Sequence, residues 1–270
     1  MDRYVVIGNP VAHSRSPEIH ARFARAAGED LVYERLLVEP GDFARAAREF
    51  FASGGRGANV TLPFKVDAFE FAHERTPRAA QAGAVNTLAL RGAVVLGDNT
   101  DGAGLVRDLT ANLGLALSGK RILLLGAGGA ARGVVAPLLG LRPAELVIAN
   151  RTSSRAAELA RAFAGAGPVR HAGFDAMGSG YDLVVNATSA STHGEPLLLP
   201  AGVFAPGATA YDMAYGAAAG PFLDGARAAG ARASDGLGML VEQAAEAFCI
   251  WRGVRPDTTA VIAELRAGLC

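Results

Sequence analysis

The chain has 270 residues, of which 50% are hydrophobic and 19% are charged. This balance is typical of a soluble globular protein with one large domain or two smaller ones. Basic and acidic residues number 26 each, so no overall charge favours nucleic acid or an anionic membrane. No apolar run approaches a membrane span, and the two cysteines, Cys249 and Cys270, make neither a disulfide framework nor a metal site. We therefore expect an unprocessed cytoplasmic protein without nucleic acid or membrane partners. Any ligand would have to be bound by a local site and not by the overall charge of the protein.

The N-terminal part of the chain predicts short strands that alternate with helices. Apolar alternation or short apolar runs indicate strands, and apolar residues at helical spacing after a proline indicate helices. Strands are expected over residues 4–7, 31–38 and 57–61, and helices over 17–27, after Pro40 and from Pro63. A hairpin is expected over 85–90 and 93–97, around the turn Arg91-Gly92.

Two serines stand at the start of the first predicted helix. Pro17 suits the first helical position, and Ser16 before it suits the N-cap. Alternatively, the hydroxyls of Ser14 and Ser16 are presented at a helix N-terminus, where a carboxylate binds favourably. The two interpretations are compatible.

Three further polar residues carry two interpretations each. Lys65 lies in the first turn of a predicted helix, where the macrodipole disfavours a cation, so it is either a tolerated surface lysine or functional. Asp101 either caps the helix that follows it or serves a site. Gln243 falls inside an apolar helix, where its amide needs a ligand or interdomain hydrogen bond unless it lies at a groove edge.

The stretch RILLLGAGGAAR, residues 121–132, predicts a buried strand, a tight turn and a helix. The turn fits G-x-G-x-x-A over Gly126, Ala127, Gly128, Gly129, Ala130 and Ala131. In this pattern Gly126 permits the turn, Gly128 lets the backbone approach a pyrophosphate, and Ala131 lets the helix pack against the strand. The phosphates would bind the free N–H groups at the N-terminus of the helix.

A second strand over 145–149 ends where this fold meets the adenosine ribose. It is followed by Asn150, Arg151 and Thr152, and then by Arg155, with no Asp or Glu at its end. An acid there would bind a free 2′-hydroxyl, whereas guanidinium groups bind a 2′-phosphate, so the pair indicates NADP rather than NAD. The alternative is two solvated arginines at the start of a helix.

Three more strands are expected over 169–171, 182–186 and 208–212, alternating with helices. This alternation predicts a parallel doubly wound sheet. Residues 186–189, Asn-Ala-Thr-Ser, fall at the carboxyl end of a strand, the edge at which such sheets bind ligands.

Taken in order, these stretches resemble the shikimate dehydrogenase family of the shikimate/quinate dehydrogenase superfamily over nearly the whole chain. The motifs are Asn9-Pro10 through Pro17, Asn59 to Lys65, Gly83 to Thr87, Asp98 to Gly102, the glycine turn, Asn150 to Thr152, Asn186 to Ser189, Tyr211 to Met213 with Tyr215, and Asp235 to Leu240 with Gln243. The resemblance implies an α/β fold of two domains with a cleft between them. An N-terminal α/β substrate domain would span 1–101 plus 236–270, and a Rossmann-type doubly wound parallel sheet would span 102–235 and bind NADP.

The resemblance also implies roles for individual residues. Lys65 and Asp101 would form the catalytic pair. The substrate would meet Ser14, Ser16, Asn59, Thr61, Asn86, Tyr215 and Gln243. The cofactor NADP(H) would meet Gly126, Ala127, Gly128, Gly129, Ala130, Asn150, Arg151, Thr152, Arg155, Ala187, Thr188, Ser189, Met213, Gly236 and Met239, and no metal is expected.

The implied activity is reversible hydride transfer between NADPH and 3-dehydroshikimate, giving shikimate for aromatic amino-acid biosynthesis. The alternatives are a quinate/shikimate dehydrogenase and, from another class, a non-catalytic NADP-binding sensor. A monomer and a homodimer both fit the sequence. Two stretches depart from the family pattern: residues 190–195 are poor in glycine, and Gly220-Pro221 stands where Thr-Pro is usual.

Overall fold

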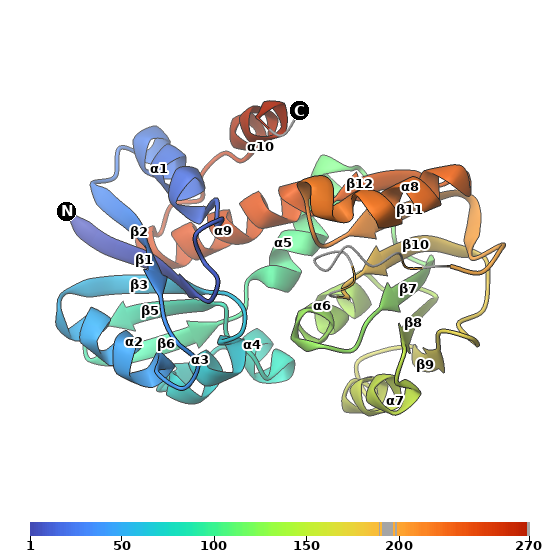
Figure 1. The fold of residues 1–270 in the computed structure, drawn as a ribbon, viewed down its shortest axis with the longest axis horizontal. Coiled ribbons are helices and arrows are strands. Elements are labelled where there is room, and N and C mark those ends of the chain that lie inside the picture. The colour runs from blue at the N-terminus through green and yellow to red at the C-terminus, as the bar shows by residue number, and fades with distance from the viewer. Residues whose placement is uncertain (189, 191–196, 198, 269–270) are drawn as a thin grey trace. The chain divides into compact units, whose positions relative to one another are not determined.

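The computed structural model describes residues 1–188, 190, 197 and 199–268, and the chain forms two compact units. The first unit contains Met1–Gly104 and Val241–Gly268, and the second contains Leu105–Leu240. The backbone leaves the first unit within helix α5 (Asp101–Arg107) and returns to it within helix α9 (Leu237–Arg252); both helices are labelled in Figure 1.

The first unit is built on a six-stranded mixed sheet in the order β2-β1-β3-β5-β6-β4. Its strands are β1 (Asp2–Gly8), β2 (Leu31–Leu37), β3 (Gly55–Val60), β4 (Glu74–Arg75), β5 (Thr87–Arg91) and β6 (Val94–Asp98). The pairs of β1 with β2 and β3 are parallel, whereas β5 pairs antiparallel with both β3 and β6. The predicted hairpin is therefore confirmed, and Gly92, at φ +62°, occupies its turn.

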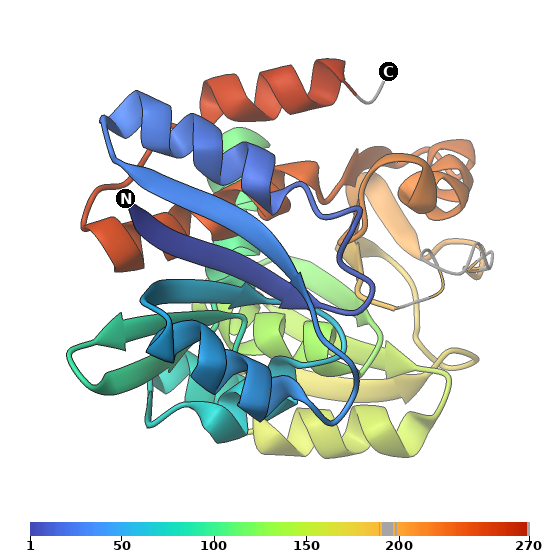
Figure 2. The ribbon, with the colours of Figure 1, turned by 60° about the vertical axis from the view of Figure 1, so that its left-hand side comes forward.

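Helices cover both faces of this sheet. They are α1 (Ser16–Ala27), α2 (Phe43–Ala52), α3 (Lys65–Phe71), α4 (Pro77–Ala82) and α9, while α10 (Thr259–Ala267) lies beside α1, to which Glu264 is ion-paired through Arg22. Figure 2 shows α1 and α2 on opposite sides of the strands. Because side chains alternate along β1, Val5 and Ile7 pack into one core with Phe43, while Tyr4 and Val6 face the other side.

Two details of the first unit differ from the sequence expectations. The N-cap of α1 is Arg15, without a side-chain capping bond, so the prediction that Ser16 caps this helix is wrong. The Ser16 side chain is instead hydrogen-bonded to Ser14. The short elements β4 and α4 were not expected, although Thr76 before Pro77 is a typical helix start and its side chain accepts from the Ala79 N–H.

The second unit contains a six-stranded sheet in the order β12-β11-β10-β7-β8-β9. Its strands are β7 (Arg121–Leu125), β8 (Glu145–Asn150), β9 (Val169–Gly173), β10 (Tyr181–Asn186), β11 (Phe204–Asp212) and β12 (Arg232–Asp235). Every pair of neighbours is parallel. This is the strand order of the Rossmann fold, and the prediction of a parallel doubly wound sheet is confirmed.

Strand β7 is buried on both faces, as its apolar run predicts. Ile122 and Leu124 pack with helices α6 (Gly129–Gly140) and α7 (Ser153–Ala162). Leu123 and Leu125 pack on the other face with residues of α8 (Gly220–Ala228). All four side chains are fully buried. The order of strands changes direction between β7 and β10, so their carboxyl ends form the switch point at which such sheets bind ligands.

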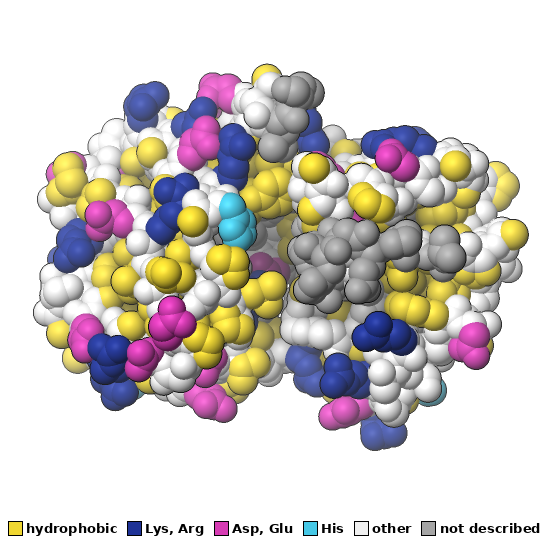
Figure 3. All heavy atoms as spheres, viewed as in Figure 1, with side chains coloured by type: hydrophobic (Ala, Val, Ile, Leu, Met, Phe, Trp, Pro, Cys, Tyr) yellow, Lys and Arg dark blue, Asp and Glu magenta, His cyan; other side chains and the backbone are white. Residues whose placement is uncertain are grey.

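The surface of each unit carries both signs of charge. On the face drawn in Figure 3, basic and acidic side chains are interspersed over both units. This agrees with the equal numbers of basic and acidic residues in the sequence. Within the described ranges, none of the helices has the length and apolar character needed to cross a bilayer.

Candidate active site

Lys65 and Asp101 form an ion pair in the first unit. Lys65 is the first residue of α3 and Asp101 the first of α5, and Lys65 Nζ lies 2.5 Å from Asp101 Oδ2. The two side chains are 20% and 10% exposed, so the pair is mostly shielded from water. The aspartate also offsets the unfavourable position of a cation at the start of a helix. Lys65 is therefore not a merely solvated surface lysine, and its ammonium group is held by a charge-assisted hydrogen bond.

Two amide side chains extend this pair. Asn86 Nδ2 donates to Asp101 Oδ1 at 2.8 Å and to Thr100 Oγ1 at 2.9 Å. The Oε1 atom of Gln243, from α9, lies 3.4 Å from both Asn86 Nδ2 and Thr100 Oγ1. The amide of Gln243 thus has partners within the first unit, as a polar group inside an apolar helix requires. Asn86, Asp101 and Gln243 are brought together with Lys65.

The two serines lie together at the N-terminus of α1. Ser14 Oγ and Ser16 Oγ are 3.2 Å apart, and the Ser16 N–H donates to Ser14 Oγ at 3.3 Å. Arg35, from β2, donates to the Ser14 carbonyl from Nη2 at 2.6 Å and so brings a positive charge beside them. Hydroxyl donors, a helix N-terminus and a guanidinium group are all suited to a carboxylate. Arg35 is not among the site residues that the sequence predicts.

Asn59 and Thr61 lie at the carboxyl end of β3. Asn59 is 5% exposed and is hydrogen-bonded to Tyr33, in β2, and to Thr87, in β5. Thr61 follows the strand directly and is half-buried. Tyr33 and Thr87 were missed by the sequence analysis. Thr87 directly follows Asn86, a predicted site residue, and this position could have identified it. The residues around Tyr33 do not distinguish it from any other tyrosine in a strand.

In the second unit, the glycine turn has the geometry that the sequence predicts. Gly126 has φ +109°, and a Cβ added to it would lie 3.0 Å from the Ala187 carbonyl oxygen, so both the turn and the close approach require glycine. A Cβ added to Gly128 would meet no protein atom within 4 Å, which leaves room for a phosphate. Ala131 is fully buried between α6 and the sheet. With the N–H groups at the start of α6, these residues fit a dinucleotide pyrophosphate.

The second predicted cofactor contact follows β8. Asn150 Nδ2 donates to the Thr152 carbonyl at 2.9 Å, which folds the chain into the start of α7. Arg151 and Arg155 are both exposed. Neither makes an ion pair with the described residues, so both guanidinium groups face solvent at the strand end. This is the chemistry that a 2′-phosphate needs.

A third loop of the second unit follows β10. Asn186 Oδ1 accepts from the Thr188 N–H at 3.0 Å, and Asn186 Nδ2 donates to Asp212 Oδ2 at 2.9 Å. These bonds tie the segment of Ala187 and Thr188 to the carboxyl end of β11. Ser189 and residues 191–196 lie outside the described residues, so the predicted role of Ser189 stays a prediction.

The turn after β11 meets the start of α9. A Cβ on Gly236 would lie 2.4 Å from the Met213 carbonyl oxygen, so only glycine permits this contact. Met239 is 7% exposed and shares a core cluster with Met213. Tyr215 follows this turn in the second unit and is half-buried.

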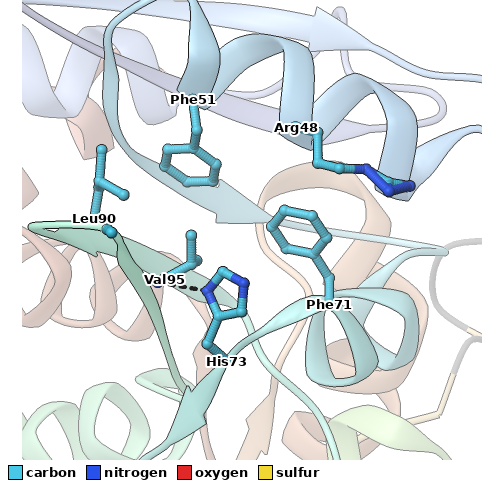
Figure 4. A pocket seen from close by; sticks show the side chains of 7 residues that line it. Arg48, Phe51, Phe71, His73, Leu90 and Val95 are labelled. Carbon is cyan, nitrogen blue, oxygen red and sulfur yellow. Dashed lines mark hydrogen bonds between the residues drawn. The ribbon is translucent and has the colours of Figure 1, made fainter.

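A separate surface pocket lies in the first unit. Figure 4 shows its aromatic side chains around His73, whose Nδ1 accepts from the Val95 N–H at 2.9 Å. It is lined by Arg48, Phe51, Phe71, His73, Leu90, Ala93 and Val95, none of which is a predicted site residue. Among the described residues, no group of three or more His, Cys, Asp or Glu is arranged to hold a metal ion.

Three family models match successive parts of this chain. The shikimate dehydrogenase substrate binding domain matches residues 6–88, the shikimate/quinate 5-dehydrogenase model matches residues 108–194, and the shikimate 5′-dehydrogenase C-terminal domain matches residues 236–266.

Individual proteins match over almost the full length. Shikimate dehydrogenase (NADP(+)) from Dechloromonas aromatica is 60% identical, covering 99% of this chain and 98% of its own. The crystal structure of an Ael1 enzyme from Pseudomonas putida superposes with a TM-score of 0.92 at 48% identity, covering 98% of each chain. Shikimate 5-dehydrogenase from Thermus thermophilus, solved in complex with NADP(H) and shikimate, superposes with a TM-score of 0.87 at 34% identity. The match covers 100% of both chains. With this similarity along its whole length, the chain belongs to the shikimate dehydrogenase family.

Proposed function

We propose that Lys65 and Asp101 carry out the proton transfer in the reversible, NADP-dependent oxidation of shikimate to 3-dehydroshikimate. The chain is an oxidoreductase that acts on a CH–OH group, and its cofactor is NADP. The observation that carries the proposal is the shielded ion pair, with Nζ and Oδ2 2.5 Å apart. A catalytically silent NADP-binding sensor would have no need for such a pair.

The chemistry of the reaction explains why a lysine is needed. When bound, NADPH supplies the hydride that is added to the carbonyl carbon of 3-dehydroshikimate. Negative charge then develops on the carbonyl oxygen, and the Lys65 ammonium neutralises it by donating a proton. In the direction of oxidation, neutral Lys65 accepts the proton of the shikimate hydroxyl. Asp101 keeps Nζ directed at the reacting oxygen and balances its charge.

The first unit supplies most of the proposed substrate contacts. Ser14 and Ser16 bind the substrate carboxylate, since their hydroxyls lie together at a helix N-terminus beside Arg35. The remaining polar groups of the substrate are bound by Thr61, Asn86, Gln243 and, from the second unit, Tyr215. The role of Asn59 is considered below.

The second unit is the proposed NADP domain. The pyrophosphate binds the N–H groups of residues 126–130, and Arg151 and Arg155 bind the 2′-phosphate, with Asn150 and Thr152 shaping that loop. The nicotinamide side is formed by Ala187, Thr188, Met213, Gly236 and Met239, next to the close contact between Gly236 and Met213.

The test is NADPH formation by the purified chain with saturating NADP and either shikimate or quinate. We expect turnover with shikimate and far less with quinate. Comparable turnover of both would favour the quinate/shikimate alternative, and NADP binding without turnover of either would favour the sensor. A folded Lys65→Ala variant that keeps normal turnover would contradict the role of the pair.

The product, shikimate, places the activity in aromatic amino-acid biosynthesis. We also propose that the enzyme acts in the cytoplasm as a monomer or homodimer.

A further inference from the structure

The side-chain amide of Asn59 has all of its hydrogen-bonding capacity in use within the protein. Its Oδ1 accepts from the Tyr33 hydroxyl at 2.8 Å and lies 3.2 Å from His20 Nε2. Its Nδ2 donates to Thr87 Oγ1 at 3.1 Å and to the Asn86 carbonyl at 3.3 Å. A primary amide has two donor hydrogens and two acceptor lone pairs, so none is left over. With Asn59 only 5% exposed, a substrate atom would have to displace one of these buried bonds.

The Asn86 carbonyl fixes the orientation of this amide. Because a carbonyl only accepts, Nδ2 of Asn59 must face it, and Oδ1 must face Tyr33 and His20. Burial lowers the pKa of His20 to about 3, although the hydrogen bond to Asn59 acts in the opposite direction. The ring is therefore neutral, and the nitrogen that carries its proton is Nε2, which faces an acceptor. Both Tyr33 and His20 are donors to Asn59.

From Asn59 onward, the donors point in one direction, toward Asp101. Thr87 Oγ1 accepts from Asn59, so its own proton is directed at Asn86 Oδ1, 2.9 Å away. Asn86 Nδ2 then donates to Asp101 Oδ1 at 2.8 Å. Hydrogen bonds aligned in this way polarise and strengthen one another. The final acceptor is the carboxylate that holds Lys65.

At its other end, this chain of bonds begins at the Tyr33 hydroxyl. Burial raises the pKa of Tyr33 well above its usual value, so the phenol keeps its proton. The Tyr33 hydroxyl therefore donates to Asn59 Oδ1. The Tyr33 ring stacks on His20 with centroids 4.3 Å apart and planes at 6°, so the hydroxyl is held in place.

We propose that Tyr33 is a positioning residue whose hydroxyl acts through Asn59 on Asp101. It sets the direction of the bonds that keep the Asp101 carboxylate beside Lys65. The proposal rests on the function proposed for that pair. Asn59 then belongs to the same positioning chain and does not contact the substrate.

The test is Tyr33→Phe, which keeps the stacked ring and removes only the hydroxyl. We expect kcat with shikimate to fall about two- to tenfold, the range for one buried hydrogen bond, with an unchanged KM for NADP. The matched control is Tyr4→Phe. Tyr4 is also buried, its ring lies 4.7 Å from that of Trp251, and its hydroxyl contacts Arg252 instead of the site. A wild-type kcat in Tyr33→Phe, or an equal loss in Tyr4→Phe, would overturn the proposal.

A second variant and a second measurement cover other outcomes. If Tyr33→Phe does not fold, Thr87→Val can replace it, because it interrupts the same series of hydrogen bonds one step closer to Asp101. Thr87→Val should lower kcat to a similar extent. A normal kcat in this folded variant would contradict the proposal. Hydrogen exchange of the Asn59 side-chain amide, followed by NMR, should be slow in the wild type and in Tyr4→Phe and faster in Tyr33→Phe. This measurement does not depend on turnover, so it decides on Tyr33 even if the wild type does not oxidise shikimate. Equal exchange in all three proteins would contradict the positioning role.

Discussion

Lys65 and Asp101 are separated by 36 positions in the chain, yet their side chains meet at 2.5 Å. If they act as proposed, Lys65→Ala should lower kcat by about a hundred- to ten-thousandfold, the range for one general acid–base group. Asp101→Ala should cost a similar factor. Because the two act as a unit, the double variant should be little worse than the worse single one.

The control for this prediction is the other lysine–aspartate pair. Lys120 Nζ lies 3.1 Å from Asp182 Oδ1, and the Lys120 side chain is 49% exposed. Lys120→Ala should leave kcat unchanged. Steady-state turnover at saturating shikimate and NADP checks all of these variants, and multiplicative losses in the Lys65 and Asp101 double variant would show that the two act independently.

Arg151 and Arg155 set the cofactor preference if they bind the 2′-phosphate. A charge-assisted hydrogen bond contributes about 1.5 to 3 kcal/mol, so replacing either arginine by alanine should lower kcat/KM for NADP about ten- to a hundredfold. The kcat/KM for NAD should not change. Arg161→Ala, near the other end of α7, is the matched control. If kcat/KM fell by the same factor with NADP and with NAD, the two arginines would not bind the 2′-phosphate.

The turn between β7 and α6 contains two glycines with different physical reasons for being glycine. Gly126 has a positive φ and a carbonyl within 3.0 Å of its missing Cβ, so Gly126→Ala should lower the free energy of unfolding by about 1 to 3 kcal/mol. Gly128 has φ −85° and ψ −171°, which any residue adopts, and no protein atom lies within 4 Å of its missing Cβ. Gly128→Ala should therefore fold normally.

The effect of Gly128→Ala should be on the cofactor, because its methyl group enters the space proposed for the pyrophosphate. We expect the Kd for NADP to rise about tenfold or more, which corresponds to ~1.4 kcal/mol. Urea unfolding and NADP titration of both variants check the pair of predictions. A destabilised Gly128→Ala protein, or one that binds NADP normally, would show that the turn does not hold the pyrophosphate as proposed.

The stability of the whole molecule depends on pH through His20. Burial lowers its pKa in the folded protein to about 3, whereas an unfolded histidine has a pKa of about 6.5. Between these values the unfolded chain binds the extra proton, so the stabilisation is present above about pH 6.5 and is lost as the pH falls toward 3. From about pH 7.5 to 5.0, His20 should remove about 2 kcal/mol from the free energy of unfolding.

His20→Gln tests this effect, because its amide can still donate to Asn59 but does not titrate in this range. Urea unfolding of both proteins at about pH 7.5 and 5.0 isolates the contribution, since the other titrating groups are common to the two. The wild type should lose about 2 kcal/mol more than the variant. If the free energy of unfolding fell equally in the wild type and in His20→Gln, His20 would take up its proton in the folded protein as well.

Much of the fold follows from local signals in the sequence. An apolar run such as residues 122–125 has to be a strand buried on both faces, because its side chains alternate between two cores. Proline in the first turn of α1 marks the start of that helix, and glycine at 126 and 92 marks turns that need a positive φ. Such signals lie within a few residues, so they also predicted the position of Lys65 in a first helical turn.

Local signals did not predict which hydrogen-bond partners the polar side chains would find. Ser16 was predicted as a cap, but its hydroxyl is bonded to Ser14 instead. The family resemblance implies that Asn59 meets the substrate, and that role stays a prediction. The structure shows that its amide is bonded by side chains from three other elements and by a backbone carbonyl. Which acceptor a hydroxyl or amide finds depends on strand register, which the local sequence does not encode.

The sequence by itself determined the family, the parallel doubly wound sheet and the glycine turn, because each rests on short runs of residues with few permitted conformations. Only the tertiary structure decided that Lys65 is paired with Asp101 rather than solvated, and that hydrogen bonds through Asn59, Thr87 and Asn86 join Tyr33 to that pair. Hydrogen bonds of this kind require donors and acceptors from different strands to come within about 3 Å, and packing of the whole first unit is what brings them there.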